Sequence, residues 1–286
     1  MTQQKIILIA GPTASGKSAL ALKLAHENKG TIINADAMQI YSGLPVLSAQ
    51  PSAEQLKTVP HELYGILDPS QRSSAGTWMQ LAKTAITKTL TQNRTPLLTG
   101  GTGLYFKSLM GGLADIPEIP KEVRHKVQEM YDTLGEEKFR KELSKLDPES
   151  AARLAKNDRQ RSIRSYEVAL HTGKPIGYWQ KKTKPGFLDD FKIERHLLLP
   201  PRDELYAACD KRFDLMIKMG AVAEAKHFLA RRLDPTLPAM KTLGLREIGA
   251  HLKGEINLKE AVIKAQQATR NYAKRQMTWF RNQWKA

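Results

Sequence analysis

The segment from Gly11 to Ser18 constrains the fold of this chain more than any other feature. It matches the pattern G-x-x-x-x-G-K-[ST] and follows an apolar run, Lys5–Ala10, that is typical of a buried parallel strand. Such a loop wraps a phosphate in backbone N–H groups, and the helix that follows presents the positive end of its dipole. We therefore expect a site for a diphosphate or triphosphate, with Lys17 at the terminal phosphate and Ser18 as a Mg²⁺ ligand. Its members are Gly11, Pro12, Thr13, Ala14, Ser15, Gly16, Lys17 and Ser18.

Strand-like and helix-like segments alternate around this loop. Short apolar runs predict strands, and longer segments with helical spacing predict helices. The alternation predicts an α/β fold, with a P-loop NTPase-like parallel sheet core flanked by helices. The expected strands are 5–10, 31–34, 96–99 and 193–199, and the expected helices are 18–28, 75–91, 202–219, 221–231 and 257–284.

The middle of the chain, from about residue 116 to residue 185, has no strand pattern. Prolines separate segments with helical spacing, such as 123–134 and 151–170, and the stretch is rich in Lys and Arg. We predict an all-helical insertion domain. The expected domains are 1–115, the first part of the core; 116–190, the insertion; and 191–286, the second part of the core, with a basic C-terminal helix.

The composition points to a polyanionic partner. The chain has 286 residues, with 45 Lys and Arg against 29 Asp and Glu, which gives a formal charge of +16. Nucleic acid is the first candidate for such a basic protein. A single cysteine, Cys209, excludes an internal disulfide framework and a zinc site made of cysteines alone. We find no signal sequence and no apolar run long enough for a membrane span, so we expect a cytoplasmic protein without membrane contact.

One acidic residue, Asp36, follows a predicted strand of the sheet that carries the phosphate loop. ATPases and kinases with this loop normally hold Mg²⁺ with an acid that follows a strand, but the predicted strand 96–99 leads into Gly100-Gly101-Thr102-Gly103. Asp36 instead follows the predicted strand 31–34. At the carboxyl edge of the sheet it would face the ligand crevice, where it could hold Mg²⁺, act as a general base or cap the next helix.

Several longer stretches together resemble one family, the tRNA dimethylallyltransferases, also called tRNA isopentenyltransferases. The matching stretches run nearly from end to end of the chain. They are GPTASGKSALALKLA from Gly11, DAMQIY from Asp36, PLLTGGTGLYFKSL from Pro96, NDRQRSIRSYEVALHTGKP from Asn157, KRFDLMIKMG from Lys211, KTLGLREI from Lys241 and ATRNYAKRQMTWFRNQ from Ala268.

The resemblance implies a reaction and its participants. The family transfers a dimethylallyl group from dimethylallyl diphosphate to the exocyclic amine of the adenosine at tRNA position 37, beside the anticodon, with Mg²⁺ as cofactor. Lys17 and Arg212 would then meet the diphosphate, and Thr102 would lie near the transferred group and the RNA. The helical insertion, 116–190, would bind the tRNA. Asp36 would take the amine proton as the new C–N bond forms, which is general-base catalysis. The target base would have to leave its stack to reach Asp36.

The last predicted helix adds a basic stripe. At 100° per residue, Arg270, Lys274 and Arg281 share one narrow face, and 258, 261, 265, 268, 272 and 279 lie on the expected apolar side. We expect the stripe to contact phosphates, with a solvated basic face as the alternative. By resemblance and by this pattern, the expected tRNA contacts are Asp36, Ala37, Met38, Gln39, Thr102, Arg124, Gln160, Arg161, Ser162, Ile163, Arg164, Lys241, Thr242, Leu243, Gly244, Leu245, Arg246, Arg270, Lys274, Arg275, Gln276, Met277, Thr278, Trp279, Phe280 and Arg281.

Two other functions remain open at this point. A nucleotide or small-metabolite kinase would explain the phosphate loop, and an RNA-binding module with a vestigial loop would explain the charge. The absence of an acid after strand 96–99 and the +16 charge disfavour the kinase, and the intact Lys17, Ser18 and Asp36 disfavour the module. Gln50 stands where the family often has a lysine, which puts a phosphate contact there in doubt. Nothing in the sequence indicates an obligate dimer, so we expect a monomer.

Overall fold

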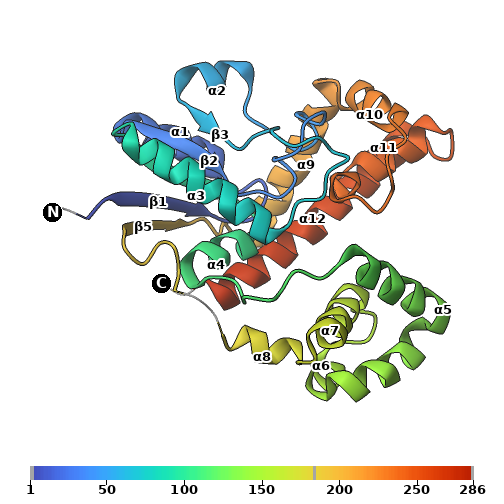
Figure 1. Ribbon diagram of the computed structural model, residues 1–286. Helices are drawn as coiled ribbons and strands as arrows, with labels where there is room; N and C mark the ends of the chain where they lie inside the picture. The colour runs from blue at the N-terminus through green and yellow to red at the C-terminus, as the bar shows by residue number, and fades with distance from the viewer. Residues whose placement is uncertain (1–2, 183–184, 285–286) are drawn as a thin grey trace. The chain divides into compact units, whose positions relative to one another are not determined.

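The computed structural model describes residues 3–182 and 185–284 (Figure 1). The chain divides into two compact units. The first combines Met1–Leu109 with Leu188–Ala286, and the second is Met110–Phe187. The divisions lie at 109/110 and 187/188, whereas the boundaries expected from the sequence are 115/116 and 190/191.

The first unit is built on a five-stranded sheet whose strands are all parallel. Their order is β3-β2-β4-β1-β5. This arrangement confirms the predicted α/β core, although the sequence pattern missed β3, a strand of two residues. The strands are β1 Lys5–Ala10, β2 Gly30–Asn34, β3 His61–Glu62, β4 Thr95–Gly100 and β5 Lys192–Leu197.

Apolar side chains explain why β1, β2 and β4 lie in the centre. Ile7 and Ile9 are completely buried and pack with Ala21 and Ala25 of the helix that follows the phosphate loop. Gly100 ends β4 because the chain passes very close to its neighbour there. A Cβ atom on Gly100 would lie 2.0 Å from the carbonyl oxygen of Ala35, so only glycine fits.

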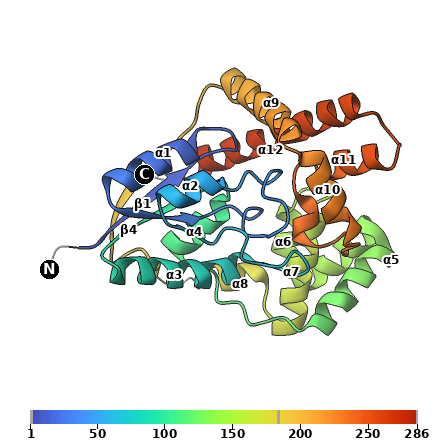
Figure 2. The same cartoon turned by 90° about the horizontal axis from the view of Figure 1, so that it is seen from above.

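Helices cover the sheet and extend the first unit. Helices α9 and α12 are sequence-distant but lie side by side in both views (Figures 1 and 2). The helices of this unit are α1 Lys17–Glu27, α2 Ala53–Thr58, α3 Ala75–Thr91, α4 Gly103–Gly111, α9 Arg202–Lys218, α10 Ala221–Ala230, α11 Leu245–Leu252 and α12 Leu258–Gln283, with a 3₁₀ turn at Pro238–Lys241.

Among the described residues of the second unit, helices are joined by loops and no strand is present, as the sequence predicts. The helix expected over 151–170 is wrong, because the chain forms two helices there. Leu154 adopts an extended backbone, and Asp158 caps the second helix by accepting a hydrogen bond from the Arg161 N–H. Gly135 interrupts α5 with φ 69°. The helices are α5 Lys121–Leu146, α6 Pro148–Arg153, α7 Arg159–Thr172 and α8 Ile176–Gln180.

Within the part of the chain that the structure describes, no helix is both long enough and apolar enough to cross a membrane.

Candidate active site

The loop between β1 and α1 has the backbone shape of a phosphate cradle. Gly16 is the N-cap of α1 in the left-handed region, with φ 89°, and no side chain caps the helix. The first turn of α1 carries no acidic residue. Gly11 is required by a close approach, because a Cβ there would lie 2.5 Å from the carbonyl oxygen of Leu198. The N–H groups at the start of α1 are thus left for an anion.

Lys17 lies at the end of this loop, where burial disfavours its charged form. Its Nζ donates to the carbonyl oxygen of Pro12 at 2.6 Å. Burial is the main cause that lowers the pKa of Lys17 to about 8; Asp36 opposes this shift and Arg212 adds to it. A bound diphosphate would favour the charged ammonium, because opposite charges stabilise each other most where water is excluded.

Arg212 brings a second cation to the same loop from α9. Its Nη2 donates to the hydroxyl oxygen of Thr13. Burial lowers the pKa of the Arg212 guanidinium, and the thiol of Cys209 and the carboxylate of Asp36 act in the opposite direction. A guanidinium remains charged in spite of such shifts and can bind two phosphate oxygens at once.

Asp36 follows β2 and is held by its own turn. Its backbone N–H donates to the Asn34 side-chain oxygen at 2.8 Å, and its Oδ1 accepts from the Met38 N–H at 2.9 Å. The helix-capping alternative for Asp36 is wrong, because the next helix, α2, begins at Ala53 and is capped by Ser52. The Oδ1 atom instead shapes the turn after the strand. Thr102 supports the next residue, since its hydroxyl oxygen accepts from the Ala37 N–H at 3.0 Å.

Two adjoining cavities bring these side chains together. A cavity of about 290 Å³ lies over the phosphate loop and includes Lys17, Ser18, Asp36 and Arg212 in its lining. A second, of about 330 Å³, shares Asp36 and Arg212 with the first but is mainly apolar. The apolar contribution comes from Met38, Leu47, Phe213, Met216, Leu243 and Tyr272. One end of the combined site thus suits a charged group, and the other suits hydrocarbon or a flat ring.

Comparison with known proteins identifies relatives along nearly the whole chain. A family model described as IPP transferase matches residues 39–283, more than half of the chain, and a model described as isopentenyl transferase matches residues 4–65. A tRNA dimethylallyltransferase of Caulobacter sp. (strain K31) is 51% identical over 99% of this chain and 91% of its own length. The corresponding protein of Rhodospirillum centenum is 49% identical over 97% of this chain and 88% of its own.

The chain belongs to the IPP transferase family. Solved structures agree with this membership. The tRNA isopentenylpyrophosphate transferase of Bacillus halodurans is 32% identical, with a TM-score of 0.67 over 99% of this chain and 88% of that one. A eukaryotic dimethylallyltransferase acting on tRNA is 25% identical, with a TM-score of 0.83 over 97% of this chain and 70% of that one. The chain is accordingly a transferase of this family, and membership disfavours both the kinase and the vestigial-loop alternatives.

The expected RNA contacts of the first unit differ in how far their side chains are exposed. Those on the surface of the first unit are Lys241, Arg246, Lys274, Arg275, Thr278 and Arg281, with Ala37, Met38, Gln39, Thr102, Leu243, Arg270 and Trp279 half-buried. Buried among them are Thr242, Gly244, Leu245, Gln276, Met277 and Phe280. We remove the side chains of the buried group from the proposed RNA surface, because they pack inside the unit.

The apolar side of α12 is rotated from the one expected. The buried residues are Ala261, Ala265, Thr269, Ala273, Gln276, Met277 and Phe280, whereas positions 268, 272 and 279 are only half-buried. Two polar residues at inward positions caused the error. The Thr269 hydroxyl donates to the Ala265 carbonyl oxygen at 2.8 Å, and Gln276 bonds to two distant loops. Hydrophobic spacing does not recognise a polar residue that is satisfied inside the fold.

Gln276 is the positioning residue that the sequence pattern missed. Its Oε1 accepts from the Thr13 N–H at 2.8 Å, and its Nε2 donates to the Gly101 carbonyl oxygen at 2.8 Å. It thereby joins the phosphate loop to the glycine-rich turn after β4. Only its place in the stretch that resembles the family offered a signal, because no local spacing relates it to Thr13.

Glu224 of α10 was missed for the same reason. Its two carboxylate oxygens accept from the backbone N–H groups of Val46 and Leu47 at 2.7 and 2.8 Å. Burial raises the pKa of Glu224, and these two hydrogen bonds lower it. The contact holds the loop that carries Leu47 and Ser48 into the cavities. Gln50, in the same region, donates to the Tyr41 carbonyl oxygen at 2.7 Å, so its side chain stabilises the loop that contains both residues.

The second unit carries its own group of expected RNA contacts. Arg124, Gln160 and Arg161 are exposed, while Ser162 and Ile163 are buried and are removed as side-chain contacts. The remaining residue of the group, Arg164, is half-buried and pairs with Glu167 at 3.5 Å. The exposed members keep this unit available as a basic surface.

Proposed function

We propose that this chain transfers a dimethylallyl group from dimethylallyl diphosphate to the exocyclic amine of the adenosine at position 37 of tRNAs, adjacent to the anticodon. The products are N6-isopentenyladenosine and diphosphate. One observation carries the proposal: Lys17 and Arg212 meet at the phosphate loop in a cavity that also contains Asp36. The names of the relatives and the +16 charge support a tRNA acceptor.

Departure of the diphosphate is the step that the two cations assist. As the allylic C–O bond breaks, negative charge grows on the diphosphate oxygens, and the P-loop N–H groups stabilise it. Lys17 supplies a point charge and Arg212 a planar group for two oxygens. The apolar cavity, lined by side chains such as Met38 and Leu47, suits the transferred group and the base.

Asp36 is the residue we assign to the proton of the amine. The amine lone pair is delocalised into the adenine ring, so the proton leaves as the new C–N bond forms. The Oδ1 atom of Asp36 is engaged by the Met38 N–H, and we assign the other oxygen to the amine. The proton passes to that oxygen, the C–N bond replaces the C–O bond, and diphosphate leaves.

Mg²⁺ is the cofactor that we propose for the donor site. The Ser18 hydroxyl lines the cavity beside Lys17 and is exposed. Among residues 3–182 and 185–284, no three His, Cys, Asp or Glu side chains form a group that could hold a metal ion. One hydroxyl fits Mg²⁺, which usually keeps several waters and binds substrate phosphates. When bound, the ion neutralises charge on the departing diphosphate.

The tRNA surface that we propose is the exposed part of the expected set. On the first unit it comprises Lys241, Arg246, Lys274, Arg275, Thr278 and Arg281, and on the second Arg124, Gln160 and Arg161. Arg270 is reassigned below. We place the reaction in the cytoplasm and propose that the enzyme acts as a monomer.

The decisive experiment mixes the purified chain, dimethylallyl diphosphate, Mg²⁺ and unmodified tRNA, and analyses the nucleosides by mass spectrometry. We expect N6-isopentenyladenosine in the wild type and a large loss with Lys17→Ala, with negligible ATP hydrolysis in either. Phosphoryl transfer from ATP to a small molecule, without nucleoside product, would replace the proposal with a kinase. Binding of tRNA without any product would indicate an RNA-binding module.

A further inference from the structure

Arg212 sits between two acidic residues on α9. Asp210 and Asp214 are four residues apart and face the same side of the helix, whereas Arg212 is rotated by about 200° from Asp210. Contacts of the two acids with another element would therefore fix which way Arg212 points. The structure gives both acids other partners.

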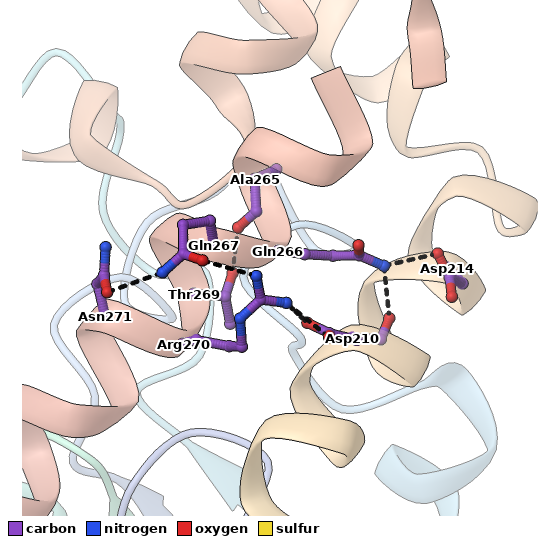
Figure 3. Close-up of polar contacts among 8 residues, drawn as sticks. All are labelled: Asp210, Asp214, Ala265, Gln266, Gln267, Thr269, Arg270 and Asn271. Atoms are coloured by element: carbon purple, nitrogen blue, oxygen red, sulfur yellow. Dashed lines mark hydrogen bonds and ion pairs between the residues drawn. The ribbon is translucent and has the colours of Figure 1, made fainter. Parts of the chain in front are cut away.

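Those partners come from one turn of α12 (Figure 3). The Arg270 Nη1 donates to both carboxylate oxygens of Asp210, each at 2.6 Å. Four residues earlier, the Gln266 Nε2 donates to Asp214 Oδ1 at 2.9 Å and to the Asp210 carbonyl oxygen at 3.3 Å. Gln266 and Arg270, one turn apart on α12, therefore bind two acids that are one turn apart on α9. Arg212 lies between these two acids in the sequence.

The orientation of Arg270 is itself supported. Its Nη2 donates to Gln267 Oε1 at 2.8 Å, and the Gln267 Nε2 donates to Asn271 Oδ1 at 3.0 Å. The Arg270 side chain is only 22% exposed and that of Asp210 34%, so water competes less than it does for a surface ion pair. Such a charge-assisted contact orders both side chains.

Apolar side chains also join the two helices. Leu205 and Cys209 of α9 pack on Ala273 and Met277 of α12. Apolar contacts of this kind set the distance between helices but are non-directional. The polar contacts of Asp210 and Asp214 are directional and therefore fix the rotation of α9 about its axis. Both acids lie within two residues of Arg212 along the helix.

We propose that the Arg270–Asp210 ion pair and the Gln266–Asp214 hydrogen bond hold α9 so that Arg212 is directed at the diphosphate. Arg270 is then a positioning residue for the donor site, and its charge is used inside the protein. This inference rests on the proposed function, because it takes the Arg212 ligand to be the diphosphate of the donor.

The test uses the full chain and inorganic diphosphate with Mg²⁺, titrated by calorimetry without RNA. Arg270→Gln should weaken diphosphate binding roughly 10- to 100-fold, since a misplacement of about 1 Å can have an effect of that size. Arg270→Lys should recover part of the loss, because lysine keeps one charged contact. Lys264→Gln, an exposed charge of the same helix, is the matched control. Thermal unfolding confirms that each variant folds, and Asp210→Asn replaces Arg270→Gln if that variant does not.

A double-mutant cycle separates positioning from general loss of structure. In an Arg212→Ala background, Arg270→Gln should cause no further loss of diphosphate affinity. Independent, additive losses would overturn the positioning role, as would wild-type affinity in Arg270→Gln alone. Wild-type affinity in Arg212→Ala would refute the proposed donor site itself, and with it this inference.

RNA binding tests whether Arg270 instead contacts an RNA phosphate. The dependence of log K on log salt for an anticodon stem-loop should be the same for Arg270→Gln and wild type. If Arg270 instead contacts an RNA phosphate, the slope flattens by roughly 0.7–0.9. That flattening would overturn the assignment.

Discussion

Gln276, in the last helix, accepts a hydrogen bond from the backbone N–H of Thr13 in the phosphate loop, across 263 residues of sequence. The same side chain donates to the carbonyl oxygen of Gly101. The phosphate loop is therefore attached to the glycine-rich turn after β4 through α12. Because Gln276 is buried, both bonds form away from competing water.

We expect Gln276→Met to destabilise the fold and weaken diphosphate binding. Methionine has a similar length, but it leaves the Thr13 N–H and the Gly101 carbonyl without their side-chain partners. Unfolding in urea should show a loss of about 2 kcal/mol or more, since each unsatisfied buried group costs ~1–3 kcal/mol. The exposed Gln283 of the same helix is the control, and Gln283→Met should change neither quantity. Equal stability for the two variants would refute the importance of the bridge.

Asp36→Asn should lower the chemical rate while keeping tRNA affinity within a few-fold. Asparagine retains a side-chain oxygen for the Met38 N–H, so the turn after β2 persists, but it cannot take the amine proton. Loss of a general base typically costs ~10²–10⁴-fold. Single-turnover kinetics at saturating RNA measures this step, and a wild-type rate would exclude Asp36 as the base. Asp36→Ala should be similarly slow and additionally less stable, because it removes the turn contact.

Diphosphate binding should weaken as the pH rises above about 8. Burial lowers the pKa of Lys17 to about 8, so the free site loses its ammonium charge near that pH. Binding above this pH must recapture a proton, which reduces the affinity by up to about tenfold per pH unit. Diphosphate itself titrates, so the comparison is with Lys17→Arg, whose guanidinium stays charged. Calorimetry in buffers of different ionisation enthalpy should detect proton uptake at pH 8.5–9 in the wild type and less in the variant. Identical pH profiles would show that Lys17 remains charged throughout.

Local patterns predicted the core of the fold because its determinants are local. The apolar run 5–10 leads into the phosphate loop at Gly11, and helix α1 begins at Lys17. Each part of this strand–loop–helix segment is explained by its neighbours in sequence. Asp36 could be placed near the loop because parallel strands end at one edge of their sheet. The two-residue strand β3 carries no such pattern, since pairing with β2 alone defines it.

The partners of the site could not be predicted from local spacing. Gln276 and Glu224 are polar, and hydrophobic periodicity places polar residues outside. Their importance comes from backbone N–H groups in distant loops, at Thr13, Val46 and Leu47. The predicted stripe on α12 shows the same limit. Sequence spacing grouped Arg270 with Lys274 and Arg281, but only tertiary structure shows that Arg270 pairs with an acid of α9.

The exposed charges of α12 give the last prediction, which concerns RNA. Lys274 and Arg281 are both exposed, in contrast to Arg270. If both contact phosphates, replacing them with Gln should flatten the slope of log K against log salt by up to about 1.4–1.8, because each contact contributes roughly 0.7–0.9. Neither side chain belongs to the buried face of α12, so thermal stability and diphosphate binding without RNA should be unchanged.

A charge-matched control separates phosphate contact from the general field of the protein. Lys259 and Lys264 are exposed on the N-terminal half of the same helix, and Lys259→Gln with Lys264→Gln removes the same charge of two. We expect the salt slope of this control to remain close to that of the wild type, since screening limits the field to about a Debye length, roughly 8 Å at physiological ionic strength. Equal flattening in the two double variants would mean that Lys274 and Arg281 act only through net charge. A wild-type slope in Lys274→Gln with Arg281→Gln would show that these two side chains are solvated and do not contact RNA. The phosphate contacts would then have to come from Lys241, Arg246 and the second unit.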